Sequence, residues 1–87
     1  MPLFQIARSL AELPDEEVDA GALRAEACLT RFPGMRWTRS YYDAAARLVT
    51  SYYEAESQEQ IREHARAAQI PCDAVIEVTE LVPDSYR

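Results

Sequence analysis

The chain has 87 residues, which is enough for one domain with a small core, because a chain of this length buries only about two-thirds of its unfolded surface. Its formal net charge of −6 argues against binding to nucleic acid or to anionic membranes, since both require clustered positive charge. All 9 cationic residues are arginine. Together with the abundant alanine, we interpret this as the composition of a bacterial protein from a GC-rich genome.

Features of a targeted or disulfide-bonded protein are not found in the sequence. No apolar run approaches the roughly 20 residues that span a bilayer, and residues 1–5 lack the basic region and apolar core of a signal peptide. We therefore expect a cytoplasmic protein. Cys28 and Cys72 are far apart and form no C-x-x-C pattern, so we expect two structural thiols.

The first predicted element is a strand over residues 3–8. Its residues partly alternate, which places Phe4 and Ile6 on one face and Gln5 and Ala7 on the other. The other face is therefore the more polar one.

A helix is predicted next, from Pro14 onward. Three acidic residues follow this proline, and the free N–H groups and dipole at a helix start favour negative charge. Apolar residues then recur at helical spacing and form the predicted buried face, namely Val18, Ala22, Ala25, Leu29 and Phe32. Residues 33–34, Pro-Gly, end the helix.

Two strands are predicted over residues 35–42 and 48–54, which are rich in Trp, Thr, Val and Tyr. Residues 43–46 suit a hairpin loop between them. The pairs at 41–42 and 52–53 are all tyrosine, and within each pair the rings point to opposite faces. We interpret the tyrosines as cross-strand aromatic packing, with a phenol acting as proton donor or ligand as the alternative.

The second predicted helix begins after Ser57, because Ser57 and Gln60 fit a capping box. Its predicted buried face consists of Ile61, His64, Ala65 and Ala68. Residues 70–71, Ile-Pro, close it.

The last predicted strand covers residues 74–82 and stops at Pro83. Alternation predicts one face with Ile76 and Val78 and the other with Glu77 and Thr79.

The order βαββαβ predicts an α+β, ferredoxin-like fold, with a four-stranded antiparallel sheet and two helices on one face. We expect a single domain over residues 1–87, with the first and third strands in the centre. The other face of the sheet would stay uncovered, and we expect a second copy to pack there as a homodimer, in a dimeric α+β barrel-like assembly.

The uncovered face is predicted to carry Gln5, Ala7, Glu77 and Thr79, but the register of the central hairpin is open. One choice directs Thr50 and Tyr52 outward together with three residues of the preceding strand, namely Trp37, Arg39 and Tyr41. A slip of one residue would move all of these side chains to the opposite face. Either choice gives a surface with aromatic rings, an arginine and a carboxylate, where a ligand or ion could bind between two copies.

His64 and Glu77 are the candidate metal ligands. His64 is the only histidine, and imidazole is the commonest metal-binding side chain, but the residues one helical turn away from it are not strong ligands. The alternative for His64 is a hydrogen-bonded histidine near the core. Glu77 is either an exposed residue paired with Arg39 or Arg36, or a metal ligand or general base in the dimer cavity.

Several short segments of the chain stand in an order that is shared with known proteins. They are residues 37–41 (Trp-Thr-Arg-Ser-Tyr), 53–55 (Tyr-Glu-Ala), 61–65 (Ile-Arg-Glu-His-Ala), 71–73 (Pro-Cys-Asp) and 77–78 (Glu-Val). With the start Met-Pro-Leu-Phe, this combination resembles a family of small bacterial nickel-binding proteins that was long catalogued as a domain of unknown function. The resemblance extends over nearly the whole chain.

The resemblance implies a ferredoxin-like fold, dimerisation through the sheets and nickel bound near the dimer interface, and it does not imply an enzyme. The positions that match the family pattern are Trp37, Tyr41, Tyr53, His64 and Glu77. Our candidates for the pocket or dimer face are Trp37, Arg39, Tyr41, Tyr52 and Tyr53.

Three functions are therefore compared. The first is a homodimer that binds a divalent transition metal, with nickel as the expected ion. The second is a cofactor-free dimeric α+β barrel enzyme or ligand-binding protein acting on a small organic molecule, which rests on fold analogy. The third is a structural dimer without catalytic function.

Overall fold

The structure is a computed structural model that describes residues 1–87. Its main elements have the following bounds: β1 (Leu3–Ser9), α1 (Glu17–Cys28), β2 (Arg36–Asp43), β3 (Leu48–Glu54), α2 (Gln58–Ala68) and β4 (Ala74–Val78). Two short 3₁₀ helices, η1 (Leu29–Arg31) and η2 (Pro83–Tyr86), follow α1 and β4 respectively. The predicted order βαββαβ is confirmed.

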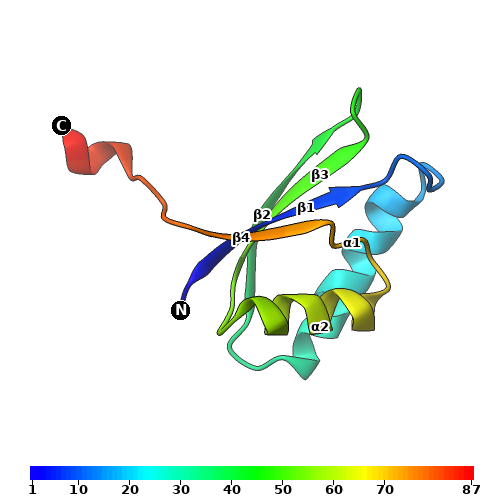
Figure 1. Ribbon diagram of the computed structural model, residues 1–87, viewed down its shortest axis with the longest axis horizontal. Coiled ribbons are helices and arrows are strands. Elements are labelled where there is room, and N and C mark those ends of the chain that lie inside the picture. The colour runs from blue at the N-terminus through cyan, green and yellow to red at the C-terminus, as the bar shows by residue number, and fades with distance from the viewer.

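The strands form one antiparallel sheet with the order β2-β3-β1-β4, so that β1 and β3 are central as predicted. Both helices lie on the same side of this sheet, and the predicted ferredoxin-like α+β fold is confirmed (Figure 1). Residues 79–87 leave the end of β4 as an extended arm that points away from the rest of the molecule (Figure 1). The opposite side of the sheet is not covered by any element of the chain.

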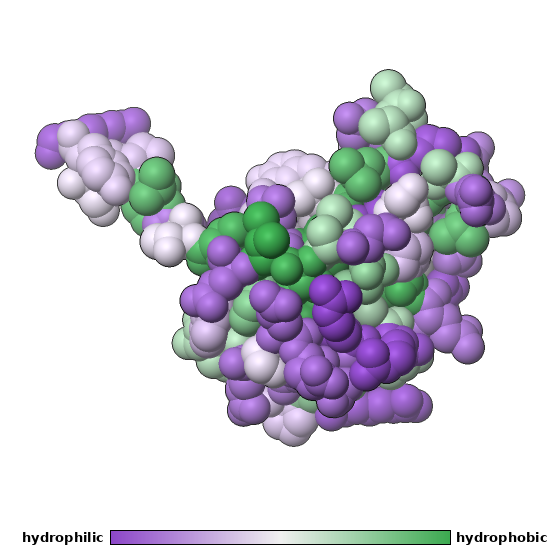
Figure 2. All heavy atoms as spheres, viewed as in Figure 1, coloured by the Kyte–Doolittle hydropathy of each residue, from purple (hydrophilic) through white to green (hydrophobic).

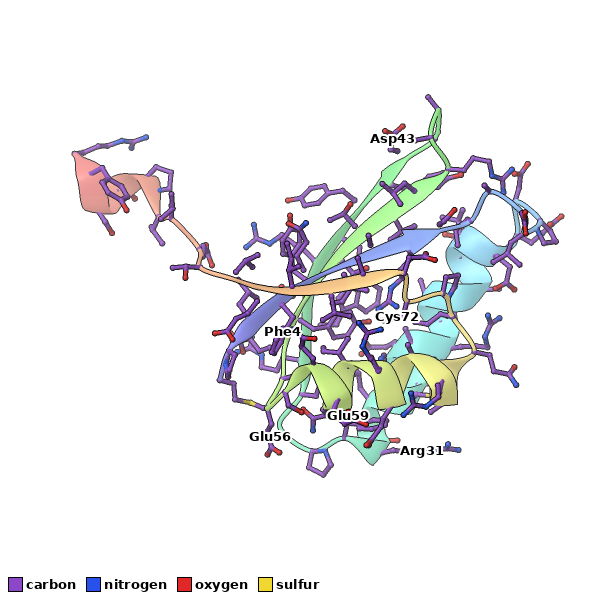
Figure 3. The ribbon with its side chains drawn as sticks, in the orientation of Figure 1. Phe4, Arg31, Asp43, Glu56, Glu59 and Cys72 are labelled. Atoms are coloured by element: carbon purple, nitrogen blue, oxygen red, sulfur yellow. The ribbon has the colours of Figure 1, made fainter.

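The hydrophobic core lies between the sheet and the helices. Along β1, the alternation predicted from the sequence directs Phe4 and Ile6 inward, where both are buried. The predicted buried face of α2 is confirmed, because its residues are all buried: Ile61, His64, Ala65 and Ala68. Figure 3 shows Phe4 between the sheet and α2, whereas Glu59 lies on the outer side of α2.

Helix α1 is less closely packed than α2. It contacts α2 rather than lying tightly on the sheet. Of its predicted buried face only Ala25 is fully buried, and the other residues are half-buried: Val18, Ala22, Leu29 and Phe32. Its N-cap, Glu16, makes no side-chain capping hydrogen bond. The small residues Gly21, Ala22 and Ala25 instead border a space between α1 and the sheet.

Of the two hairpin registers that the sequence left open, the structure has the one that directs Thr50 and Tyr52 outward, and it differs from the expectation only at Trp37. Thr50 and Tyr52 point to the uncovered side, opposite Tyr41 and Arg39. Trp37, however, pairs with the buried Tyr53 and lies on the helix side, so the prediction for Trp37 was wrong. The reason is a β-bulge between Trp37 and Arg39, since one extra residue reverses the alternation of side chains.

Strand β4 differs from the prediction in length and in facing. It ends at Val78, not at residue 82, because Val78 pairs with Leu3 and β1 offers no further partner. Glu77 pairs with Phe4 and therefore lies on the helix side of the sheet, whereas Ile76, opposite Gln5, lies on the uncovered side. The predicted facing of Glu77 was thus wrong. Glu77 is nevertheless exposed, because β4 is an edge strand of the sheet, and a charged residue is tolerated at an exposed edge position.

The start of α2 gives a first testable prediction. The Ser57 side chain accepts a hydrogen bond from the Gln60 amide at 3.2 Å, and the Gln60 side chain accepts from the Glu56 amide at 2.9 Å. We expect Ser57→Ala to lower the free energy of unfolding by about 1 kcal/mol, because a helix amide loses its partner. Urea denaturation measures this loss, and Ser85→Ala in η2 is the control. An equal loss in both variants would contradict the assignment of the cap.

Candidate functional site

The uncovered side of the sheet, called the open face below, brings together three of the predicted site residues, Arg39, Tyr41 and Tyr52. The rings of Tyr41 and Tyr52 meet edge to face with centroids 6.4 Å apart. The Tyr52 hydroxyl donates to the Gln5 side chain at 3.0 Å. Both contacts fix the tyrosines by hydrogen bonding and packing across neighbouring strands.

A shallow hollow of about 580 Å³ lies on the open face, at the end where β4 passes into the arm. Its polar lining includes two carboxylates, Glu54 and Glu80, which the sequence analysis did not single out as ligands. Glu80 lies 4.0 Å from Arg39, and Glu54 lies 3.5 Å from Arg36. One alternative for Glu77 was an ion pair with one of these arginines. That pair does not form, because Glu77 lies on the helix side of the sheet. The alternation of β3 from Thr50 and Tyr52 would have placed Glu54 on this face, whereas the position of Glu80 depends on where β4 ends.

Apolar side chains are exposed along the same side and in the arm. Ile76 on the open face is 51% exposed, and Leu81, Val82 and Tyr86 in the arm are exposed as well. Figure 2 shows hydrophobic residues gathered along β4. Apolar residues that cluster on one face of a small protein commonly mark an interface.

His64 lies on the other side of the sheet, inside the core. Its ring is completely buried, and its Nε2–H donates to the Ala25 carbonyl at 2.8 Å. The rings of Tyr53 and Phe32 pack around it, with centroids 5.4 Å and 5.6 Å away. Burial lowers the pKa of His64 below its ordinary value, so the ring is neutral. These contacts fit the alternative considered from the sequence, a hydrogen-bonded core histidine.

The predicted site residues therefore divide between two faces. Trp37 stacks on Tyr53 beside His64 on the helix side, with ring centroids 6.1 Å apart. Arg39, Tyr41 and Tyr52 lie on the open face. Glu77 is exposed at the edge of the helix side.

The side chains of one chain do not form a metal site by themselves. No three side chains of His, Cys, Asp or Glu lie close enough together to hold a metal ion. The Nδ1 atom of His64 has no hydrogen-bond partner, but the buried guanidinium of Arg8 acts on this ring electrostatically and disfavours a second positive charge there. A single chain therefore does not provide a complete nickel site, and His64 does not fit one. Cys28 and Cys72 are free thiols, as predicted.

Known proteins were compared with this fold and site. The family model described as nickel responsive protein SCO4226-like matches residues 4–78. The crystal structure of SCO4226 from Streptomyces coelicolor A3(2) is similar in fold, with a TM-score of 0.77 at 15% identity, covering 92% of this chain and 99% of that one. No curated protein matches the sequence significantly. Neither helix is long and apolar enough to cross a membrane. Since the family model covers most of the chain, this protein belongs to the family of SCO4226-like nickel responsive proteins.

Proposed function

We propose that this protein is a cytoplasmic homodimer that binds a divalent transition metal, nickel, between two protomers at the open face. The observation that supports this most is the hollow on the open face, where Glu54 and Glu80 both border a surface that the chain leaves uncovered. One chain lacks a complete set of ligands. Two copies related by a twofold axis would bring four carboxylates to one interface.

The type of donor sets the expected selectivity. Carboxylate oxygens hold divalent cations but favour hard ions, whereas imidazole suits nickel better. The family to which the chain belongs is nickel responsive, so the decisive comparison is nickel against magnesium at the same site. Copper should compete with nickel, because it binds almost any such donor set more tightly.

The test is calorimetric titration of protein free of any histidine tag with nickel, and with magnesium as the control ion. We expect saturable nickel binding that weakens at least about tenfold when Glu54→Gln and Glu80→Gln are combined, because both candidate donors lose their charge. Glu59→Gln combined with Glu63→Gln removes the same charge from exposed positions of α2 and should leave binding unchanged.

The same titration tests the ligands expected from the sequence, His64 and Glu77. Binding that weakens in His64→Ala or Glu77→Gln, and not in the Glu54 and Glu80 double variant, would place the metal at the substituted residue and overturn the open-face site. No heat above the magnesium control would remove metal binding and leave the other two functions, a protein acting on a small organic molecule and a structural dimer.

A further inference from the structure

Arg8 is a charged residue buried in the core. It follows Phe4 and Ile6 in the alternation of β1, so its side chain points to the helix side, and only 5% of its surface is exposed. Its Nη1 donates to the Pro71 carbonyl at 2.7 Å, while its Nη2 is buried without a hydrogen-bond partner. A native protein rarely leaves a buried donor unpaired, and each such donor calls for a reason.

No anion within the chain neutralises this guanidinium. The buried polar or charged residues are Arg8, Ser51 and His64, and none of them is a carboxylate. Asp73, the acid that acts on Arg8 from a distance, is exposed and accepts from the Ser9 amide at 2.6 Å. An arginine keeps its charge in a protein interior. The Arg8 guanidinium carbon lies 5.7 Å from the centroid of the Tyr53 ring, a cation–π contact, but this ring carries no charge, and a buried charge without a counter-ion is costly. An anion supplied from outside the chain would offset that cost.

A cavity of about 190 Å³ adjoins Arg8 between α1 and the sheet. Most of its lining is apolar, with Ala22 and Val49 among the residues, and Tyr53 and Trp37 also line it. The cavity exists because α1 presents small residues to it, namely Gly21, Ala22 and Ala25. This volume equals that of about six water molecules, which suits a compact molecule with a single ring.

The polar groups of the lining are mostly satisfied. The Trp37 indole donates to Ser40 at 2.8 Å, and the hydroxyls of Ser40 and Ser51 are 2.7 Å apart. Glu17 at the rim is engaged by Arg24 at 2.6 Å, while Asp19 is exposed there. Burial raises the pKa of Tyr53 to about 12, so its phenol is neutral and does not oppose an anion. Arg8 is thus the group that sets the charge of a ligand.

We propose that this cavity binds a small organic monocarboxylate, with the carboxylate on the Arg8 guanidinium and an apolar ring against Ala22 and Val49. A planar guanidinium matches a carboxylate in geometry as well as in charge. The apolar lining favours such an acid over inorganic phosphate. This site lies on the helix side of the sheet, and Tyr41 at the edge is the one lining residue that it shares with the hollow of the proposed metal site on the open face.

The test uses benzoate as the probe, with benzamide as its neutral counterpart and phosphate as a second anion. Trp37 is the only tryptophan, so its indole N–H gives one assignable signal in a two-dimensional NMR spectrum. We expect benzoate to shift this signal saturably and to raise the melting temperature, and benzamide to bind at least about tenfold more weakly.

Two variants separate a binding role of Arg8 from a structural one. Arg8→Gln keeps amide donors without the charge, and we expect it to weaken benzoate binding at least about tenfold while benzamide is unaffected. Ala22→Leu fills the cavity from α1 and should abolish binding of benzoate in a protein that stays folded, which decides the question if Arg8→Gln is unstable. Arg36→Gln, at an exposed arginine, is the matched control.

Three results would overturn the proposal. They are the absence of a saturable shift with benzoate, equal binding of benzamide, and unchanged benzoate binding in folded Ala22→Leu protein. Binding of phosphate in place of benzoate would replace the organic acid by an inorganic anion and would equally contradict the proposed ligand class.

Discussion

Replacing Ile76 by aspartate is expected to convert the proposed dimer into a monomer. Ile76 lies on the open face opposite Gln5 and is half exposed in the isolated chain. In a dimer built through this face, aspartate would be buried without a partner, which costs several kcal/mol per charge. We expect the dissociation constant to rise by at least about a hundredfold, as measured by analytical ultracentrifugation.

Leu23→Asp is the matched control for this experiment. Leu23 is even more exposed, at 73%, but lies on α1 and not on the sheet. The control should therefore remain as dimeric as the unmodified protein. An Ile76→Asp protein that dimerises normally, or an unmodified protein that is monomeric at high concentration, would argue against the open face as the interface.

Acidification is expected to destabilise the protein through His64. Burial lowers the pKa of this histidine, opposed by its hydrogen bond to Ala25 and reinforced by the charge of Arg8. Below pH 6.5, the ordinary pKa of histidine, the unfolded chain therefore binds a proton that the folded chain does not. The free energy of unfolding should fall as the pH decreases below this value, by at most about 1.4 kcal/mol per pH unit, until the depressed pKa is reached.

Urea denaturation on both sides of pH 6.5 measures this dependence, with His64→Gln as the comparison. Glutamine keeps a donor for the Ala25 carbonyl but does not titrate, so its stability should change little over the same range. The measurements must stay above pH 4.5, because Arg24 lowers the pKa of Glu17 and that pair loses its stabilising effect only below this value. Equal pH dependence in both proteins would contradict a neutral, buried His64.

Local patterns predicted most of the fold correctly. The alternation of Phe4 and Ile6 defined β1, and the cap at Ser57 with the spacing of Ile61 and Ala65 defined α2. These features depend on neighbouring residues only, which is why a single sequence is enough to find them. The family resemblance was also confirmed.

The placement of the candidate site residues depended on contacts between distant segments. The facing of Trp37 is set by a bulge that forms only when β2 pairs with β3. Glu77 was assigned to the wrong face because apolar Ile76 and Val78 looked like core residues, whereas the pairing of β4 with β1 makes them the open-face residues. Continuing the alternation of β1 by two more residues would have revealed Arg8 as an inward-facing charge.

The two helices are held with unequal strength, and this has a consequence for motion. α2 has a side-chain cap and four buried residues, whereas α1 lacks the cap and borders a void. Segments with few buried contacts open at a lower free energy than the whole protein. Transient detachment of α1 would therefore expose the Arg8 guanidinium to water while the hydrogen-bonded strands stay intact, and solute exchange with the interior would not require global unfolding.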